Sequence, residues 1–326
     1  MKSAANIYAQ EKLKIEKKLF RLLEGKFPNS LYEPCDYILK SSGKRLRAIL
    51  VLFSAKACGL KFMDVYNASL AVEILHNFTL VHDDIMDNAE KRRGLPTLHI
   101  KYDLSTAILA GDNLIAIAYE NLLKDCNGNS KKVLQTFTKG IVEVCEGQSL
   151  DKEFENRSDV TLSEYLLMIQ KKTAALAEMC CKLGAEISNA GKDEIKNLSA
   201  YGKNLGMAFQ IQDDLLDIIA DENELGKKIG GDLLEGKKTF LFLSALDLAK
   251  GKEKQKLLNL IENKGAKPDE IDYYKNLYIK LGVTEKAKKE ILKYSNKALA
   301  SVNKIKNAEA KYLFNWLIEA LINRKK

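Results

Sequence analysis

The chain has 326 residues, of which 46% are hydrophobic and 29% charged. That apolar content is ample for a core and excludes a disordered chain. Only four prolines occur, and residues typical of long helices predominate, so the composition favours an all-α fold. The net charge of +8 comes from basic residues spread along the whole chain. This even spread, without aromatic residues interleaved among the basic ones, argues against a nucleic-acid platform. The excess of positive charge indicates mild attraction for anionic ligands.

Helical periodicity predicts long helices separated by short turns. In chain order, the predicted helices cover residues 7–23, 45–58, 65–87, 104–123, 131–150, 162–186, 195–220 and 238–249, followed by shorter ones from residue 255 onward. No linker rich in serine or proline interrupts them, so the sequence predicts a single domain over residues 1–326.

The sequence also predicts a cytoplasmic protein. No stretch reaches the roughly 18 apolar residues of a membrane span, and the N-terminus lacks the apolar segment of a signal peptide. The six cysteines include no C-x-x-C pair, so we expect reduced, buried thiols.

Two of the predicted helices carry the same acidic pattern, Asp83-Asp84-Ile85-Met86-Asp87 and Asp213-Asp214-Leu215-Leu216-Asp217. The first and last aspartates of each lie on one helix face, where their carboxylates repel one another unless they share a cation. We expect the apolar pair between them to be buried. Mg²⁺ is commonly held by one or two carboxylates together with substrate phosphates, so the pattern predicts a magnesium–diphosphate site. One such segment alone is equally typical of a solvated helix face, and the second copy favours the metal.

Basic residues that could bind a diphosphate flank the first acidic segment. Lys44 and Arg47 lie at a predicted helix start, where backbone N–H groups also attract anions. Arg92 and Arg93 precede a turn that can bend them back toward the aspartates, and His76 lies two helical turns before Asp83. Taken singly, each of these residues also has an ordinary structural explanation.

Taken together, the motifs occur in the order found in one enzyme family. They are G-K-R-L-R (43–47), H-x-F-T-L-V-H-D-D-I-M-D-x5-R-G-L-P-T (76–97), G-Q-x-x-D (147–151), K-T-A-A-L (172–176), F-Q-I-Q-D-D-L-L-D (209–217) and G-K-K-I-G-G-D-L-L-E-G-K-K-T (226–239). The chain resembles the trans-prenyl diphosphate synthases, especially the short-chain geranylgeranyl and farnesyl diphosphate synthases, with no departure at a motif position.

The resemblance implies an all-α isoprenoid-synthase helical bundle around a large central cavity, and a homodimer. The implied reaction joins isopentenyl diphosphate head to tail with dimethylallyl, geranyl or farnesyl diphosphate. We expect mainly geranylgeranyl diphosphate (C20), because in the family a single aromatic residue at the position of Phe78 forms a floor beneath the growing chain. Farnesyl diphosphate (C15) is the alternative product.

The family's functional residues can be carried over to matching positions. Asp83, Asp87 and Asp213 would hold about three Mg²⁺ ions that bridge the allylic diphosphate. The oxygens of that diphosphate would bind Arg92, Lys172 and Lys237, with Lys227 beside them. Isopentenyl diphosphate would bind Lys44, Arg47, His76 and Arg93. Thr173 and Gln210 would face the reacting carbons.

Two other functions were considered. A terpene cyclase shares the first acidic segment, but its second motif mixes Asn, Ser or Thr with Glu, unlike Asp213-Asp214-x-x-Asp217. A non-catalytic subunit of a prenyltransferase complex would be expected to have lost aspartates or the Lys44 and Arg47 pair, and all of these are present. The basic end, Arg324-Lys325-Lys326, resembles a tail that covers the site in this family, and is equally typical of a solvated terminus.

Overall fold

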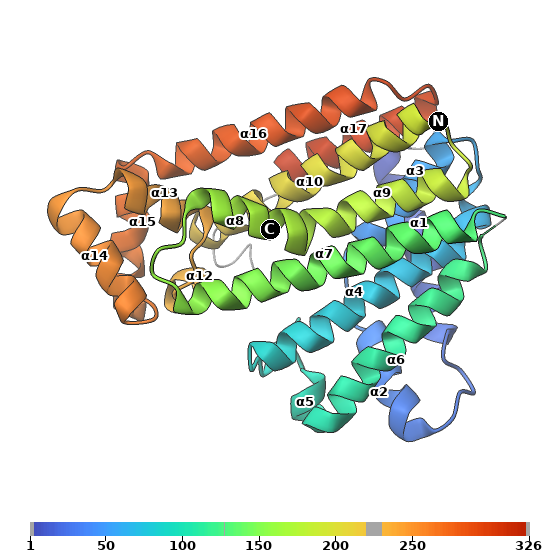
Figure 1. Cartoon of the computed structure of the whole chain (residues 1–326), viewed down its shortest axis with the longest axis horizontal. Helices are drawn as coiled ribbons and strands as arrows, with labels where there is room; N and C mark the ends of the chain where they lie inside the picture. The colour runs from blue at the N-terminus through green and yellow to red at the C-terminus, as the bar shows by residue number, and fades with distance from the viewer. Residues whose placement is uncertain (1–2, 127, 220–229, 324–326) are drawn as a thin grey trace. The chain divides into compact units, whose positions relative to one another are not determined.

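Helices make up nearly all of the regular structure in this computed structural model, which describes residues 3–126, 128–219 and 230–323 (Figure 1). The all-α class predicted from the sequence is confirmed. Among the described residues, no helix is both long and apolar enough to cross a membrane.

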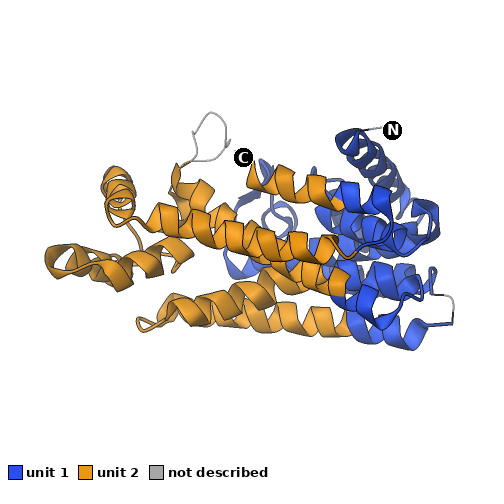
Figure 2. Cartoon of the chain, turned by 90° about the horizontal axis from the view of Figure 1, so that it is seen from above, with its two compact units in different colours: residues 1–136, 180–196, 305–313 blue, residues 137–179, 197–304, 314–326 orange. Residues whose placement is uncertain are grey.

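Two compact units divide the chain (Figure 2). Unit 1 comprises residues 1–136, 180–196 and 305–313, and unit 2 comprises residues 137–179, 197–304 and 314–326. The division falls inside four helices, α7 (Ser130–Asn156), α9 (Ala175–Ile187), α10 (Lys192–Ile219) and α17 (Ala308–Ile322). The single domain predicted from the sequence stays a prediction.

Unit 1 also holds the elements of the first part of the chain. They are α1 (Ala4–Arg21), α2 (Asn29–Leu39), α3 (Leu46–Ala57), η1 (Phe62–Val65), α4 (Tyr66–Met86), β1 (Lys91–Arg92), β2 (Leu95–Pro96), α5 (Leu98–Lys101) and α6 (Leu104–Leu123). Helix α4 packs most extensively against α6 and also contacts α3 and α1. Its buried residues include most positions from Ala68 to Val81, so α4 is the core helix of this unit.

Unit 2 also holds α8 (Leu162–Ile169), the π-helical turn η2 (Gln170–Ala174), α12 (Gly231–Leu234), α13 (Phe240–Leu248), α14 (Gly251–Glu262), η3 (Pro268–Glu270), α15 (Ile271–Lys280) and α16 (Val283–Val302). Helix α13 contacts α8, α14, α15 and α16. Its first six residues, Phe240 to Ala245, are all buried, so α13 is a core helix here.

Polar caps explain where several helices begin. The side chains of Asp103 and Thr161 accept from the backbone N–H groups of Thr106 and Glu164, which starts α6 and α8. The Glu164 carboxylate in turn accepts from the N–H of Thr161, which completes a capping box.

The predicted long helices are confirmed, but several local features were missed. Helix α2, which contains Pro34, and the short elements η1, α5 and α12 were not predicted. Proline lowers helical propensity. A π turn interrupts the range 162–186, which was predicted as one helix. The short hairpin of β1 and β2 was also not predicted. Of the six cysteines, which were expected to be buried, Cys35, Cys180 and Cys181 are buried, Cys58 and Cys126 are partly buried, and Cys145 is exposed.

Candidate active site

The first acidic segment lies at the end of α4 in unit 1. Asp84 is 2% exposed, and its Oδ1 accepts a hydrogen bond from Arg92 Nε at 2.7 Å. Burial raises the pKa of Asp84, and Arg92 partly offsets that shift. Asp83 and Asp87 are more exposed and lie one helical turn apart. Asp84 therefore anchors the segment, and Asp83 and Asp87 are the pair placed to share a cation.

One expectation for this segment is wrong. The apolar pair between the aspartates was expected to be buried, but Met86 is 39% exposed and Ile85 only partly buried. The reason is that Asp84, paired with Arg92, takes the inward position on this turn of α4. In the second segment the expectation is confirmed, because Leu215 and Leu216 are buried.

A tight hairpin separates Arg92 from Arg93. Arg93 and Gly94 both have positive φ, 52° and 80°, between the paired residues Arg92 and Leu95, which is the geometry of a two-residue type I′ turn. Arg92 turns toward Asp84 as described, whereas Arg93 Nη1 donates to the carbonyl of Ser42 and, at 3.3 Å, to Ser41 Oγ. Arg92 therefore bends back to an aspartate as predicted, whereas Arg93 turns to the loop 40–45 instead.

The loop 40–45 and the start of α3 carry the predicted anion-binding residues Lys44 and Arg47. Arg47 Nη1 lies 3.1 Å from His76 Nε2 on α4. Burial, followed by the positive charge of Arg47, lowers the pKa of His76 well below its ordinary value. The neutral ring therefore accepts from Arg47 at Nε2 and turns Nδ1 toward Thr79 Oγ1. His76 thus orients Arg47 in this structure.

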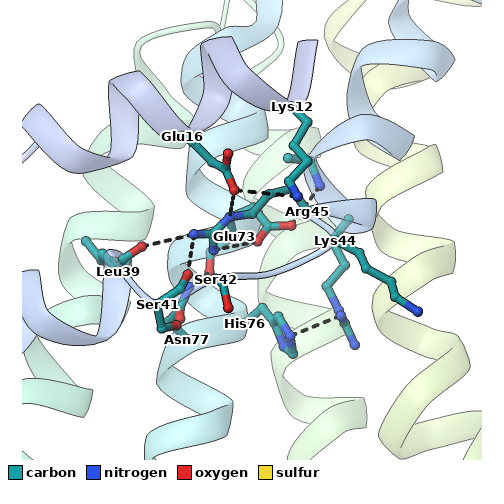
Figure 3. Close-up of polar contacts among 12 residues, drawn as sticks. Lys12, Glu16, Leu39, Ser41, Ser42, Lys44, Arg45, Glu73, His76 and Asn77 are labelled. Carbon is teal, nitrogen blue, oxygen red and sulfur yellow. Dashed lines mark hydrogen bonds and ion pairs between the residues drawn. The ribbon is translucent and has the colours of Figure 1, made fainter. Parts of the chain in front are cut away.

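Two charged residues of this region were not singled out from the sequence. Arg45 is 3% exposed, and Glu73 is 2% exposed. Figure 3 shows them together, with Glu16 of α1 and the carbonyl groups of Leu39 and Ser41 around the guanidinium. The available signal was Glu73 itself, a charged residue inside the otherwise apolar run from Ala71 to Leu75.

The motif Lys172-Thr173 lies in the π turn η2 of unit 2. Lys172 Nζ lies 2.6 Å from Asp151 Oδ2 on α7, and the Thr173 hydroxyl donates to Gln210 Oε1 on α10 at 3.0 Å. A π turn adds a residue to a helical turn and is frequent at functional sites. Here the π turn contains two of the predicted catalytic residues, Lys172 and Thr173, and the third, Gln210 on α10, is the partner of Thr173.

The second acidic segment repeats the arrangement of the first. Asp214 is 4% exposed and accepts from the Tyr165 hydroxyl, from Gln210 Nε2 at 3.1 Å and from the N–H of Phe240 at 3.0 Å. Burial raises its pKa to about 6, against the effect of these donors. Asp213 is exposed. Because Asp214 fixes the Gln210 amide, the oxygen of that amide faces Thr173.

The third aspartate of this segment has a structural partner. Asp217 Oδ2 accepts from the N–H of Asp232 at 3.1 Å, at the start of α12. Burial, followed by the negative charges of Asp214 and Asp217, raises the pKa of Asp232 to about 8.

The predicted diphosphate-binding residue Lys237 has two acidic neighbours. Lys237 Nζ lies 3.9 Å from Asp232 and 2.6 Å from Glu235. Burial lowers the pKa of Lys237, but these carboxylates outweigh burial and raise it overall, so Lys237 stays charged. Lys227 lies outside the described residues.

The donor set suits a hard divalent cation that also binds phosphate. Asp83, Asp87 and Asp213 offer only carboxylate oxygens, the ligands that Mg²⁺ prefers. Within the described residues, no three side chains of His, Cys, Asp or Glu form a ready-made cation cage. Carboxylate ligands of this kind fit Mg²⁺, which commonly takes its remaining ligands from water and from substrate phosphates.

Comparison with known proteins identifies the family of this chain. The family model described as polyprenyl synthetase matches residues 28–278. A geranylgeranyl diphosphate synthase of Saccharolobus solfataricus is 43% identical over 303 residues, covering 91% of each chain. A geranylfarnesyl diphosphate synthase of Aeropyrum pernix is 33% identical over 92% of this chain and 96% of that one. The crystal structure of a geranylgeranyl pyrophosphate synthetase from Pyrococcus horikoshii superposes with a TM-score of 0.90 at 37% identity, covering 98% of both chains. The chain therefore belongs to the polyprenyl synthetase family and is a short-chain trans-prenyl diphosphate synthase.

Proposed function

We propose that this enzyme condenses isopentenyl diphosphate with dimethylallyl, geranyl and farnesyl diphosphates, using Mg²⁺, and releases mainly geranylgeranyl diphosphate. The observation that carries the proposal is the shared design of the two acidic segments. In each, the middle aspartate is buried and partnered, and outer carboxylates remain toward the surface. Several relatives named geranylgeranyl diphosphate synthase support the C20 product.

The proposed reaction begins when the allylic C–O bond breaks, leaving a carbocation and a diphosphate. Asp83, Asp87 and Asp213 would hold the magnesium, and the bound metal would stabilise the charge that develops on the leaving diphosphate. Lys172, Lys237 and Arg92 would donate to its oxygens. Asp151 and Asp84 already hold two of these cations, at 2.6 and 2.7 Å, which supports preorganised donors.

Carbon–carbon bond formation would follow in the same site. The double bond of isopentenyl diphosphate attacks the allylic cation, and the departed diphosphate accepts the proton that is then lost. The Thr173 hydroxyl and the Gln210 amide oxygen, joined by a 3.0 Å hydrogen bond, would place oxygen dipoles beside the cation. The second diphosphate would bind Lys44, Arg47 and Arg93, with His76 orienting Arg47.

The test measures turnover and product length with purified enzyme, Mg²⁺, isopentenyl diphosphate and each allylic diphosphate. Asp83→Ala should lower kcat by about 100-fold or more, because the lost ligand acts on charge that develops in the transition state. EDTA should stop the wild-type enzyme without changing its helical circular dichroism, and added Mg²⁺ should restore activity. The control is Asp269→Ala, which removes an exposed aspartate of η3. Near-wild-type kcat of Asp83→Ala would refute the metal assignment.

We also propose that the enzyme is a homodimer in which α6 forms part of the contact. Leu104, Ile108 and Leu123 are 53%, 42% and 46% exposed. With the partly exposed Ile115 and Tyr119 they are spaced as one face of the helix. Asp112, whose side chain is 62% exposed, lies on the same face, and the apolar residues around it support burial against a second copy.

A further inference from the structure

Arg45 combines two unfavourable features. Its backbone is in the left-handed region, at φ 54° and ψ 27°, which a non-glycine residue adopts only when its surroundings require it. Its side chain is 1% exposed, so a permanently charged guanidinium has been removed from water. Both features persist only because specific partners compensate for them.

The compensation comes from four groups on different segments of unit 1. Arg45 Nη2 donates to the carbonyls of Leu39 at 3.1 Å and Ser41 at 2.6 Å. Its Nε lies 3.6 Å from Glu16, and its Nη1 lies 3.6 Å from Glu73, so both carboxylates provide counter-charge. A planar guanidinium has five N–H donors in a fixed fork, whereas a lysine has three on one nitrogen and cannot serve all four groups.

Glu73 links this cluster to the start of α3. One of its carboxylate oxygens faces Arg45, and the other accepts from the N–H of Ala48 at 3.2 Å. Ala48 is the third residue of α3, a position whose N–H has no acceptor within the helix. The buried carboxylate therefore caps α3 from α4, one turn before His76 on the same helix.

These contacts hold the loop 40–45, which carries Lys44 and leads into Arg47, the candidate anion-binding residues. Arg45 fixes the carbonyls of Leu39 and Ser41 from the buried side, and Arg93 donates to the carbonyl of Ser42. A Cβ on Gly43 would lie 3.0 Å from Arg93 Nη1, so a side chain there would press on the arginine that donates to Ser42. Figure 3 shows Lys44 leading away from the buried Arg45 cluster.

We propose that Arg45, held by Glu73 and Glu16, is the positioning residue of the isopentenyl diphosphate subsite, fixing the loop 40–45 and the first turn of α3 so that Lys44 and Arg47 are preorganised for the diphosphate. Arg45 does not itself touch the substrate, because its guanidinium is buried among loop carbonyls and carboxylates. This inference rests on the proposed function, since it takes Lys44 and Arg47 to bind that diphosphate.

The main test compares Arg45→Lys with the wild-type enzyme. Lysine keeps the charge but cannot serve both carbonyls and both carboxylates, so the loop loses its fixed geometry. We expect the KM for isopentenyl diphosphate to rise about tenfold or more, while the KM for the allylic diphosphate stays the same and kcat changes less than about threefold. The matched control is Arg21→Lys, which changes an exposed arginine of α1 in the same unit and should have wild-type kinetics.

Two further measurements separate positioning from general destabilisation. Calorimetric titration with isopentenyl diphosphate in the absence of Mg²⁺ should give a correspondingly weaker Kd for Arg45→Lys. Glu73→Gln keeps an acceptor for Ala48 but removes the counter-charge, and it should raise the same KM. Arg45→Ala should have a larger effect than Arg45→Lys, which retains part of the function, and Arg45→Lys remains informative if Arg45→Ala does not fold.

The outcomes are distinguishable. An unchanged KM and Kd for isopentenyl diphosphate in folded Arg45→Lys would overturn the inference. So would a fall in kcat with both KM values unchanged, which is the signature of a smaller folded fraction. A wild-type enzyme that neither binds isopentenyl diphosphate nor elongates an allylic diphosphate would instead refute the proposed function.

Discussion

The middle aspartate has the same role in both acidic segments, although its partners differ. Asp84 holds Arg92 of the hairpin, and Asp214 holds Gln210, Tyr165 and the start of α13. A buried carboxylate is stable only when hydrogen bonds or counter-charges surround it, so these partners are required by its position. In each segment the buried middle carboxylate therefore fixes the neighbouring elements.

Substitution of the single side chain Phe78 can test the proposed product length. It is 7% exposed and packs edge-on against His82, with ring centroids 4.6 Å apart. It lies five residues before Asp83, which is about 7.5 Å along the helix axis. If its ring is the floor beneath the growing chain, Phe78→Ala should shift the products beyond C20 while activity is retained. Chromatography of the extracted products measures this shift.

The control for Phe78 is Phe62→Ala, which removes a partly buried ring of η1 and should leave the product distribution unchanged. Because removing a buried ring destabilises a protein by about 3–5 kcal/mol, melting temperatures must accompany both variants. An active Phe78→Ala enzyme with wild-type products would show that Phe78 is a core residue and not the ruler.

Among the elements, the π turn η2 depends on two glycines of neighbouring helices. A Cβ on Gly147 of α7 would lie 2.6 Å from the Cα of Lys172, and one on Gly206 of α10 would lie 3.0 Å from the Cβ of Ala174. Both helices thus approach η2 at backbone distance. This close approach places Asp151 next to Lys172, and Gln210 next to Thr173.

We therefore expect Gly147→Ala to displace the π turn. Overpacking of this kind costs about 1–3 kcal/mol, which lowers Tm by roughly 2–4 °C for each kcal/mol in a chain of this size. Because Lys172 and Thr173 move with the turn, kcat should fall about tenfold or more. Calorimetry and steady-state kinetics measure the two effects.

Gly140→Ala is the matched control, since Gly140 lies two turns earlier on α7 and the three atoms nearest to its added Cβ, led by Sδ at 2.3 Å, all belong to the flexible side chain of Met179. That side chain can move aside, so kinetics close to wild type are expected. If Gly147→Ala also kept wild-type kcat and Tm, the tight contact between α7 and η2 would have no functional importance.

Sequence patterns predict a helix where the apolar spacing is regular. They do not predict local structure that depends on packing between distant segments. Helix α4 and helix α10 follow the helical period, and both were found with their aspartates. The π turn has ordinary helical spacing in the sequence and depends on the glycines of α7 and α10, which are distant in the chain. The capping of α3 by Glu73 is likewise a contact between helices, so no local rule predicts it.

At the scale of the whole molecule, the motifs were sufficient to assign the family but not to assign each residue a task. The pattern D-D-x-x-D treats its aspartates alike, and only tertiary burial separates Asp84 and Asp214 from their neighbours. The pattern G-K-R-L-R likewise suggested Lys44 and Arg47 and said nothing of Arg45, whose importance depends on Glu16 and Glu73. The order of the motifs therefore identifies the enzyme family, whereas the residues that support the site are recognised only from their burial in the structure.

The proposed homodimer can be tested by a substitution on the exposed face of α6. Stable protein interfaces bury about 1,200–2,000 Å² in total, and introducing charge near the centre of an apolar contact weakens association by several kcal/mol. Ile108→Glu keeps helical propensity and adds a charge to the α6 stripe. We expect light scattering to report a dimer for the wild-type chain and a monomer for Ile108→Glu at micromolar concentration. Ile279→Glu is the control, because Ile279 on α15 is 52% exposed and lies outside the stripe. A wild-type monomer would refute the homodimer, and a dimer that survives Ile108→Glu would place its contact elsewhere than α6.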